Sequence, residues 1–122
     1  MMQHLEVDFI ITHPKGYELN PEITKNSLIN HNQEDALKDA DFVYVKNWSS
    51  YNDYGKILND DEHWMMTKDK LGNAKFMHCL PVRRNVVVED AVLDSDQSVV
   101  IQQANNRTFA AQVVLKQLLK NL

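Results

Sequence analysis

The stretch KFMHCL at residues 75–80, closed by Pro81, is an apolar run of strand length. Proline cannot donate a hydrogen bond to a sheet ladder, so a strand is expected to end at Pro81. A second run, DFVYVK at residues 41–46, has the same β-branched and aromatic character and is the clearest strand in the first half of the chain. The segment between them contains a short helical pattern, which indicates an α/β fold.

The rest of the chain continues this alternation. Further strands are predicted over residues 5–12, 27–30 and 98–102, and helices over residues 22–26, 33–40, 67–71 and 88–93, with a final helix capped by Asn105 or Asn106. Strands and helices that alternate over short connections favour a single domain over residues 1–122. Its sheet should be doubly wound, mostly parallel and Rossmann-like, with helices on both faces.

The final helix carries one apolar stripe. Its members follow helical spacing and are expected to pack on the sheet: Ala111, Val114, Leu115, Leu118 and Leu122. Residues 48–61 show no sustained period and read as a long loop, with one turn of helix near residues 56–58.

Composition and charge narrow the functional classes. The chain has 122 residues, of which 43% are hydrophobic, and a net charge of −4 with scattered basic residues, so a nucleic-acid partner is not expected. No apolar run approaches the length of about 18 residues that a membrane span needs. Cys79 is the only cysteine, which excludes an intramolecular disulfide and favours a reducing, cytoplasmic setting.

Common metal and nucleotide signatures are missing from the sequence. His4, His13, His31 and His63 lie far apart and form no HxxH or HExxH pattern, so no metal site is expected. The sequence also lacks GxGxxG, GxxxxGK[ST] and GxSxG, so no cofactor is expected.

The most informative local feature is HCLPVRRN at residues 78–85. Ligands of doubly wound folds bind where loops leave the carboxyl ends of the strands, and this run leaves such an end. A cis Leu80–Pro81 bond would expose the Leu80 carbonyl and the Cys79 side chain there. The alternative is a buried cysteine, a histidine at the edge of the core and a solvated arginine pair. Nothing nearby supplies a general base for a catalytic thiolate.

Two other strand ends carry cations. Lys46 closes the strand before Asn47 and Trp48 and could meet a carboxylate, or could be an edge lysine beside a packing tryptophan. Arg107 follows the last predicted strand at the start of the final helix and could stabilise an oxyanion or phosphate, or could simply be exposed.

These motifs together resemble the second domain of the carbamoyltransferases, which move a carbamoyl group from carbamoyl phosphate to an amine. HCLP followed by VRRN is the most specific marker. The resemblance continues through EDAV at residues 89–92, SVVI at 98–101, ANNR at 104–107 and VVLKQLL at 113–119.

Within that family the chain is similar to the branch that acts on N-acylated ornithine, with an ordinary ornithine carbamoyltransferase as the alternative. The ornithine enzymes carry an aspartate and an SMG motif for the substrate ammonium, whereas this sequence has Lys46 and no SMG. A lysine repels an ammonium but suits a substrate whose α-amine is an uncharged amide. Val87 stands where some acetylornithine members carry a lysine, which favours the succinylornithine-like side.

The resemblance implies roles for individual residues. Lys46 and Arg83 resemble the pair that holds the substrate α-carboxylate. Cys79, Leu80 and Arg107 resemble the groups that face the carbamoyl moiety. Trp48, His78 and Pro81 complete the expected substrate-binding set.

Other family features are absent from the sequence. Nothing resembles the S-[ST]-[RS]-T phosphate loop, and the first strand and helix of the family domain, expected before Leu5, are missing. The chain is therefore expected to be the amino-acid-binding domain of a carbamoyltransferase and inactive alone. It would form a homo-oligomer or associate with a separate carbamoyl phosphate-binding domain. The alternatives are a non-catalytic module that binds acylated amino acids, and a structural remnant that self-associates through an uncovered sheet edge.

Overall fold

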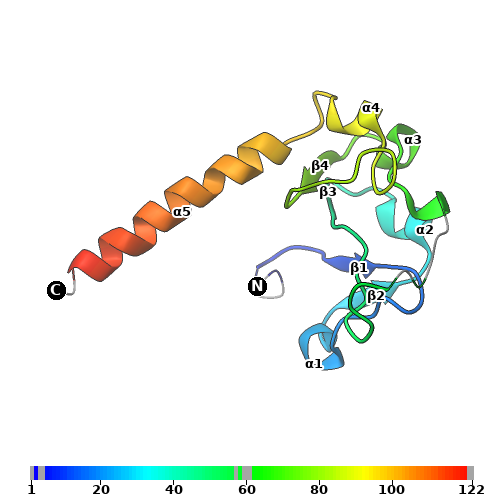
Figure 1. Ribbon diagram of the computed structural model, residues 1–122, viewed down its shortest axis with the longest axis horizontal. Coiled ribbons are helices and arrows are strands. Elements are labelled where there is room, and N and C mark those ends of the chain that lie inside the picture. The colour runs from blue at the N-terminus through cyan, green and yellow to red at the C-terminus, as the bar shows by residue number, and fades with distance from the viewer. Residues whose placement is uncertain (1, 3–4, 57, 59–61, 121–122) are drawn as a thin grey trace.

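The computed structural model describes residues 2, 5–56, 58 and 62–120 and has an α/β architecture. Its strands are β1 (Ile10–Thr12), β2 (Leu28–Asn30), β3 (Phe42–Val45) and β4 (Lys75–His78). Its helices are α1 (Pro21–Thr24), α2 (Gln33–Leu37), the 3₁₀ turn η2 (Glu62–Trp64), α3 (Lys68–Leu71), α4 (Asp90–Leu93) and α5 (Val100–Lys120) (Figure 1). The α/β class predicted from the alternating pattern is confirmed.

The strands pair in parallel, as predicted, and form two separate two-stranded sheets. In one sheet β1 pairs with β2, with Ile11 opposite Ile29. In the other β3 pairs with β4, with Val43 opposite Phe76 and Val45 opposite His78. The predicted strand over residues 5–12 is shorter in the structure, because β2 offers β1 only three partner residues.

The short helices begin within two residues of their predicted starts. Asn20 accepts a hydrogen bond from the Glu22 N–H and stands before Pro21, the first residue of α1. Asn32 caps α2, and Thr67 caps α3. Side-chain acceptors at these positions satisfy amides that have no partner inside the helix.

The core lies between one face of the β3–β4 pair and the helices α3 and α4. Phe76, Val88 and Val92 are fully buried. Side chains alternate between the two faces of a strand, so Phe42 and Tyr44 of β3 lie on the opposite face, where they are 66% and 50% exposed.

The predicted strand over residues 98–102 is wrong. Only Ser98 pairs with β4, through a bridge to Phe76, and α5 already begins at Val100. The β-branched residues there are compatible with a strand or with the buried start of a helix. The stretch that follows is polar, contains alanine and has no glycine or proline, so it favours a helix. Asn105 and Asn106 consequently lie inside the helix, so the predicted cap at these residues is also wrong.

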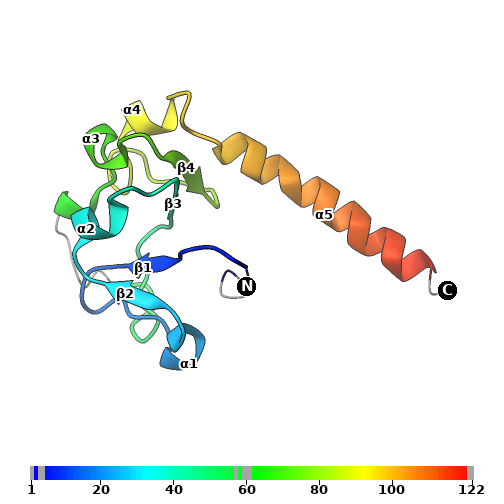
Figure 2. The same cartoon turned by 180° about the vertical axis from the view of Figure 1, so that it is seen from behind.

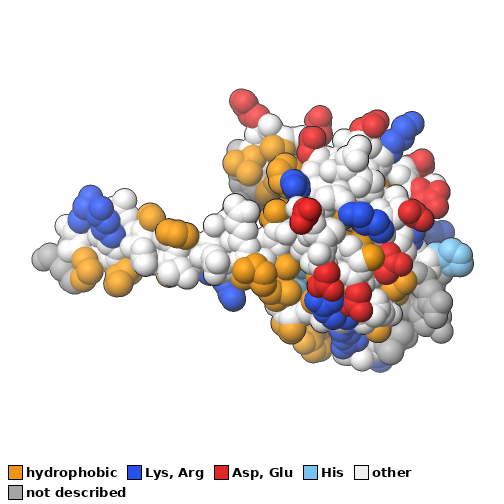
Figure 3. Space-filling model, turned by 90° about the horizontal axis from the view of Figure 1, so that it is seen from above, with side chains coloured by type: hydrophobic (Ala, Val, Ile, Leu, Met, Phe, Trp, Pro, Cys, Tyr) orange, Lys and Arg blue, Asp and Glu red, His pale blue; other side chains and the backbone are white. Residues whose placement is uncertain are grey.

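The predicted packing of the final helix on the sheet is wrong as well. Val114, Leu115 and Leu118 are 57–61% exposed, and Ala111 is exposed, while Leu122 lies outside the described residues. The helix leaves the body after its first turns (Figure 2). Apolar side chains are exposed along it (Figure 3). The prediction failed because the direction of the helix axis depends on contacts at its first turn, where Val100 is buried, and not on the stripe.

Two remaining expectations concern loops and membranes. Residues 48–56 form no helix or strand, and the helical turn predicted near residues 56–58 falls partly on Ile57, which lies outside the described residues. Within the ranges that the structure describes, no helix is both long and apolar enough to traverse a bilayer.

A large-to-small substitution tests this placement of the core. Phe76→Ala should lower the free energy of unfolding by about 3–5 kcal/mol, because it empties space in a fully buried cluster. Phe42→Ala is the matched control, since Phe42 lies on the paired strand but faces solvent, and should change stability by about 0.5 kcal/mol or less. Urea denaturation of both variants measures the difference, and equal losses would contradict the assignment of faces.

Candidate functional site

The segments that follow β3 and β4 meet at the carboxyl ends of the two strands. Parallel pairing brings these ends to one edge of the sheet. The Asn47 side-chain amide donates a hydrogen bond of 2.9 Å to the Pro81 carbonyl and so ties the two segments together. Residues 34 positions apart in the sequence are thereby held at one place.

The turn that leaves β4 is organised by His78. The His78 side chain is 1% exposed, and its Nδ1 accepts a hydrogen bond of 2.9 Å from the Leu80 N–H. The Leu80–Pro81 peptide bond is cis, and Leu80 has a φ of 49°. The chain therefore reverses directly after Cys79, whose side chain stays exposed.

Helix α5 is attached to the same strand end. The His78 N–H donates a hydrogen bond of 3.1 Å to Oε1 of Gln103, which is one turn before Arg107 on the helix. Gln103 and Arg107 consequently share a helix face. This contact brings Arg107 to the mouth of β4.

A hollow of about 380 Å³ lies at this junction. Its wall is made by the end of β3, the residue after β4 and one face of α5, namely Tyr44, Cys79, Gln103, Ala104, Asn106, Arg107 and Ala110. Cys79 and Arg107, which sequence reasoning selected separately, thus line one hollow. The Arg107 Nε makes a 3.4 Å hydrogen bond to the Ala104 carbonyl within the helix.

The Tyr44 phenol interacts with the Cys79 thiol in this hollow. Partial desolvation raises the pKa of the Tyr44 phenol, and the hydrogen bond and charge interaction with Cys79 raise it further. A hydrogen bond with Gln103 lowers the same pKa. The phenol is therefore neutral at physiological pH and can act as a hydrogen-bond donor.

Two ionisable residues follow or end the strands beside the hollow: Lys46 is positively charged, and His78 is neutral. Burial lowers the pKa of His78, and the positive charge of the nearby Lys46 lowers it further. The His78 ring is therefore neutral at pH 7, and because Leu80 donates to its Nδ1, its proton is on Nε2. Lys46 itself is exposed at the end of β3.

The two arginines of the VRRN motif have different surroundings. Arg84 donates to Asp90 at 2.6 Å and to both carboxylate oxygens of Asp94 at 2.7 and 3.0 Å. These ion pairs hold the pKa of both carboxyls below the ordinary value. Arg84 thus fastens the loop to α4. Arg83 is exposed, and its backbone carbonyl accepts a hydrogen bond from the Val87 N–H at 3.0 Å.

Trp48 and Pro81 are not among the residues that form the wall of the hollow. The Trp48 ring packs against Tyr17, with ring centroids 6.2 Å apart. Pro81 is exposed and supplies the carbonyl that Asn47 binds. The wall also does not include Lys46, Leu80 or Arg83.

Sequence reasoning missed Tyr44, Gln103 and Asn106. Tyr44 lies between the buried Val43 and the partly buried Val45, so its exposed face could have been found from the strand period. Gln103 would have been found from its i, i+4 relation to Arg107, had the helix been predicted to begin before residue 105.

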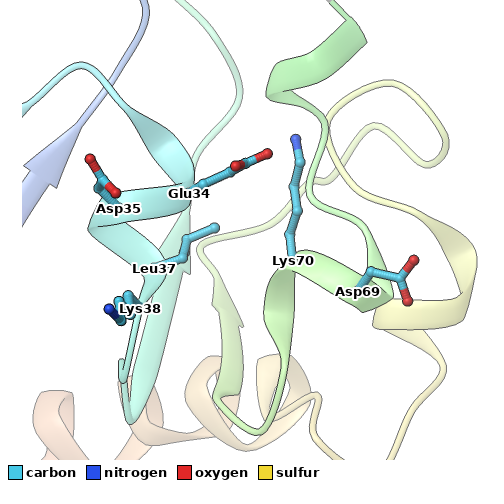
Figure 4. Close-up of a pocket in the computed structure, with 6 residues that line it drawn as sticks. All are labelled: Glu34, Asp35, Leu37, Lys38, Asp69 and Lys70. Atoms are coloured by element: carbon cyan, nitrogen blue, oxygen red, sulfur yellow. The ribbon is translucent and has the colours of Figure 1, made fainter.

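A second hollow, of about 410 Å³, lies between α2 and α3. Glu34 and Lys70 point toward one another across it (Figure 4). The Lys70 Nζ is already held by Gln33 and by the backbone carbonyls of His63 and Met65. None of the residues that sequence reasoning selected lines this hollow. Within the described ranges no three His, Cys, Asp or Glu side chains are grouped as a metal site would need, and His4 lies outside those ranges.

Comparison with known proteins places the chain among carbamoyltransferases. The family model described as "Aspartate/ornithine carbamoyltransferase, Asp/Orn binding domain" matches residues 1–118. The chain is 48% identical to an N-succinylornithine carbamoyltransferase of Bacteroides fragilis, over 99% of this chain and 40% of that protein. It therefore spans well under half the length of the curated relatives it matches.

Solved structures agree with this match. An acetylornithine transcarbamylase complexed with acetylcitrulline superposes with a TM-score of 0.72 and 28% identity, over 82% of this chain and 36% of that one. The ornithine carbamoyltransferase of Thermus thermophilus gives a TM-score of 0.76 and 28% identity, over 89% of this chain and 38% of that one.

The buried histidine makes stability depend on pH in a defined direction. Below pH 6.5, the ordinary pKa of histidine, the unfolded chain binds a proton at His78 that the folded chain excludes until lower pH. The contribution of the neutral His78 to the free energy of unfolding is therefore present above pH 6.5. It is lost as the pH falls through and below that value. Urea midpoints at pH 7.5 and 5.5 measure the loss.

The control is His78→Asn, which keeps an acceptor for the Leu80 N–H but does not titrate. The variant should lose less stability than the wild type between the two pH values. An equal loss in both proteins would show that His78 is not the group responsible.

Proposed function

Because the chain belongs to the aspartate/ornithine carbamoyltransferase family, we propose that it binds the amino-acid substrate of a carbamoyltransferase acting on N-acylated ornithine. In this role the domain positions the substrate δ-amine against the carbamoyl group of carbamoyl phosphate, in a step of arginine biosynthesis. The observation that carries the proposal is the shared hollow of Cys79 and Arg107, at the strand end that the HCLP motif marks.

The choice of an acylated substrate rests on charge. Lys46 is a cation at the end of β3, and the adjacent His78 is neutral, so this edge of the site attracts a carboxylate and repels an ammonium. An N-acylornithine offers an α-carboxylate and an uncharged amide, whereas free ornithine also carries an α-ammonium. In the proposal Lys46 and Arg83 hold the α-carboxylate, and both side chains are exposed at neighbouring strand ends.

The carbamoyl group is assigned to the other side of the turn. The Leu80 carbonyl accepts a hydrogen bond from the carbamoyl NH₂ and fixes the plane of the group, while the exposed Cys79 side chain lies beside it. Arg107 supplies positive charge to the oxygen that becomes an oxyanion. Tyr44 adds a neutral phenolic donor in the same wall.

The reaction proceeds by direct transfer. The neutral δ-amine attacks the carbamoyl carbon and forms a C–N bond, and the tetrahedral oxyanion then collapses as the bond to the phosphate oxygen breaks. The amine proton leaves with the departing phosphate or the solvent, and no covalent bond to the protein forms. The protein contributes orientation and preorganised charge.

The phosphate of carbamoyl phosphate has no assigned ligands in this sequence. No S-[ST]-[RS]-T loop is present in the sequence. In the proposal the domain therefore works with a carbamoyl phosphate-binding domain, and as an isolated domain it binds its amino acid without turnover.

Isothermal titration with N-succinylornithine, N-acetylornithine and ornithine tests the substrate class. The two acylated compounds should bind and ornithine should bind at least about tenfold more weakly, because Lys46 opposes its ammonium. Lys46→Gln should weaken binding of the acylated compounds about 10- to 100-fold, the range for a charge-assisted hydrogen bond. Lys38→Gln, which removes an exposed lysine of the other hollow, is the matched control. Preferential binding of ornithine would indicate an ordinary ornithine site.

A carbamoyl-transfer assay tests whether the chain acts alone. The isolated 122-residue protein with carbamoyl phosphate and N-succinylornithine should produce no N-succinylcitrulline above the uncatalysed rate. The reason is that the sequence contains no loop that is assigned to bind the phosphate of carbamoyl phosphate. Turnover that disappears in Arg107→Ala would refute the requirement for a second domain, although it would support the assignment of the site.

A further inference from the structure

Helix α5 is seated on the rest of the molecule by a small part of its length. Of its 21 residues, all of which the structure describes, only Val100 is buried. Gln103 and Ala104 are half-buried, and every residue of the range 105–120 is exposed. The contacts that fix the helix therefore lie in its first turns, and Gln103 is the one polar residue among the three that are covered.

The Gln103 amide oxygen takes the place of a backbone partner of β4. The Phe76 N–H donates to the Gln97 carbonyl at 2.9 Å, on the edge of β4 that faces away from β3. In a parallel ladder, residues two apart turn their N–H groups to the same edge, so the His78 N–H points there too. Because α5 has already begun at Val100, Oε1 of Gln103 accepts from this N–H at 3.1 Å.

The other end of the same amide contacts β3. A hydrogen bond with Gln103 lowers the pKa of Tyr44, so the Gln103 amide N–H donates to the phenol oxygen. The Tyr44 phenol also interacts with the Cys79 thiol. One planar side-chain group thus joins β3, the end of β4 and the first turn of α5, and its two hydrogen bonds together fix its orientation.

These contacts determine where Arg107 lies. Val100 anchors the start of α5, and a second fixed point is needed to set the direction of the helix axis. Gln103 supplies that point, and Arg107 follows four residues later on the same helix face. The Arg107 Nε bonds only within the helix, to the Ala104 carbonyl at 3.4 Å, which does not hold the helix on the sheet. Arg107 and Cys79 nevertheless line one hollow.

We propose that Gln103 is a positioning residue that holds the Arg107 guanidinium against Cys79, on the side of the site that takes the carbamoyl group. The inference rests on the proposed function, in which Arg107 faces the carbamoyl oxygen while Lys46 and Arg83 hold the α-carboxylate. Gln103 acts through Arg107 and has no part in holding the carboxylate. Loss of its amide should therefore weaken binding of the carbamoyl group and leave binding of the carboxylate nearly unchanged.

Two ligands that differ in the carbamoyl group test this separation. N-succinylcitrulline carries a carbamoyl group on its δ-nitrogen, whereas N-succinylnorvaline has the same carboxylate and acyl amide with a plain propyl side chain. Isothermal titration of the full chain gives the ratio of the two affinities. Gln103→Met keeps the length and helix propensity of glutamine but removes the amide. It should reduce the ratio about tenfold, because Arg107 no longer meets the carbamoyl oxygen.

The neighbouring glutamine provides the matched control. Gln102 lies on the same helix and is exposed, so Gln102→Met should change neither affinity. In Gln103→Met the affinity for N-succinylnorvaline should change by less than about twofold, the usual range for a substitution that removes no contact of the ligand. A loss of that size for one ligand and not for the other is an effect that a general loss of stability would not produce.

A second measurement needs no ligand. Cys79 is the only cysteine and is exposed, so a nitroxide label attaches at one position. The label should broaden the amide resonances of Arg107 and Ala110 in the wild type and in Gln102→Met, because both residues line the hollow with Cys79. Broadening should be weaker in Gln103→Met, because α5 is no longer held at the end of β4.

The outcomes separate this inference from the proposed function. An unchanged affinity ratio or unchanged broadening in Gln103→Met overturns the inference, and an equal loss of affinity for both ligands shows a structural role only. A wild type that binds neither ligand overturns the proposed function, and the broadening alone then decides whether Gln103 places Arg107. If Gln103→Met does not fold by circular dichroism, Gln103→Asn replaces it, since its amide is one methylene too short to reach His78. The same results overturn the inference in that variant.

Discussion

Parallel pairing of β3 with β4 is the interaction on which the rest of the molecule depends. It places Val43 beside Phe76 and Val45 beside His78, and the buried face of these pairs is the wall against which α3 and α4 pack. The same pairing brings two strand ends to one edge, where the Asn47–Pro81 hydrogen bond can form. Core and candidate site are therefore two consequences of one ladder, the core on its face and the site at its carboxyl end.

Neighbouring residues of the HCLPVRRN motif have different structural roles. His78 is buried and shapes the turn through the Leu80 N–H, whereas Cys79 stays open to the hollow. Arg84 is used to hold the loop on α4 through Asp90 and Asp94, which leaves Arg83 as the exposed arginine of the pair. The ion pairs of Arg84 therefore hold the loop without restricting the side chain of Arg83, the arginine to which the proposed function gives a binding role.

The exposed apolar surfaces of the molecule share a cause. Helix α5, about 31 Å long at 1.5 Å per residue, and the face of β3 that bears Phe42 are both apolar where a partner would cover them. Ala110 belongs to the wall of the hollow, and Val114 follows one turn later on the same helix, so the exposed apolar surface of α5 begins next to the hollow. In a family whose members are more than twice as long, such surfaces are expected where the rest of the protein meets this part.

The sequence by itself determined the elements whose local signals agree. Runs such as DFVYVK and KFMHCLP specify strands through their β-branched and apolar residues, and Asn20 and Asn32 mark helix starts through their side-chain acceptors. Cys79 and Arg107 were also found from the sequence, because family motifs mark them. Residues 98–102 were misassigned because a short apolar run fits a strand or a helix, and the helix-favouring stretch that follows it continues back to Val100. The tertiary structure alone decided three features: the structural role of Arg84, the direction of α5, and the presence of Tyr44 and Gln103 in the wall of the hollow. Each depends on contacts between residues that are distant in the chain.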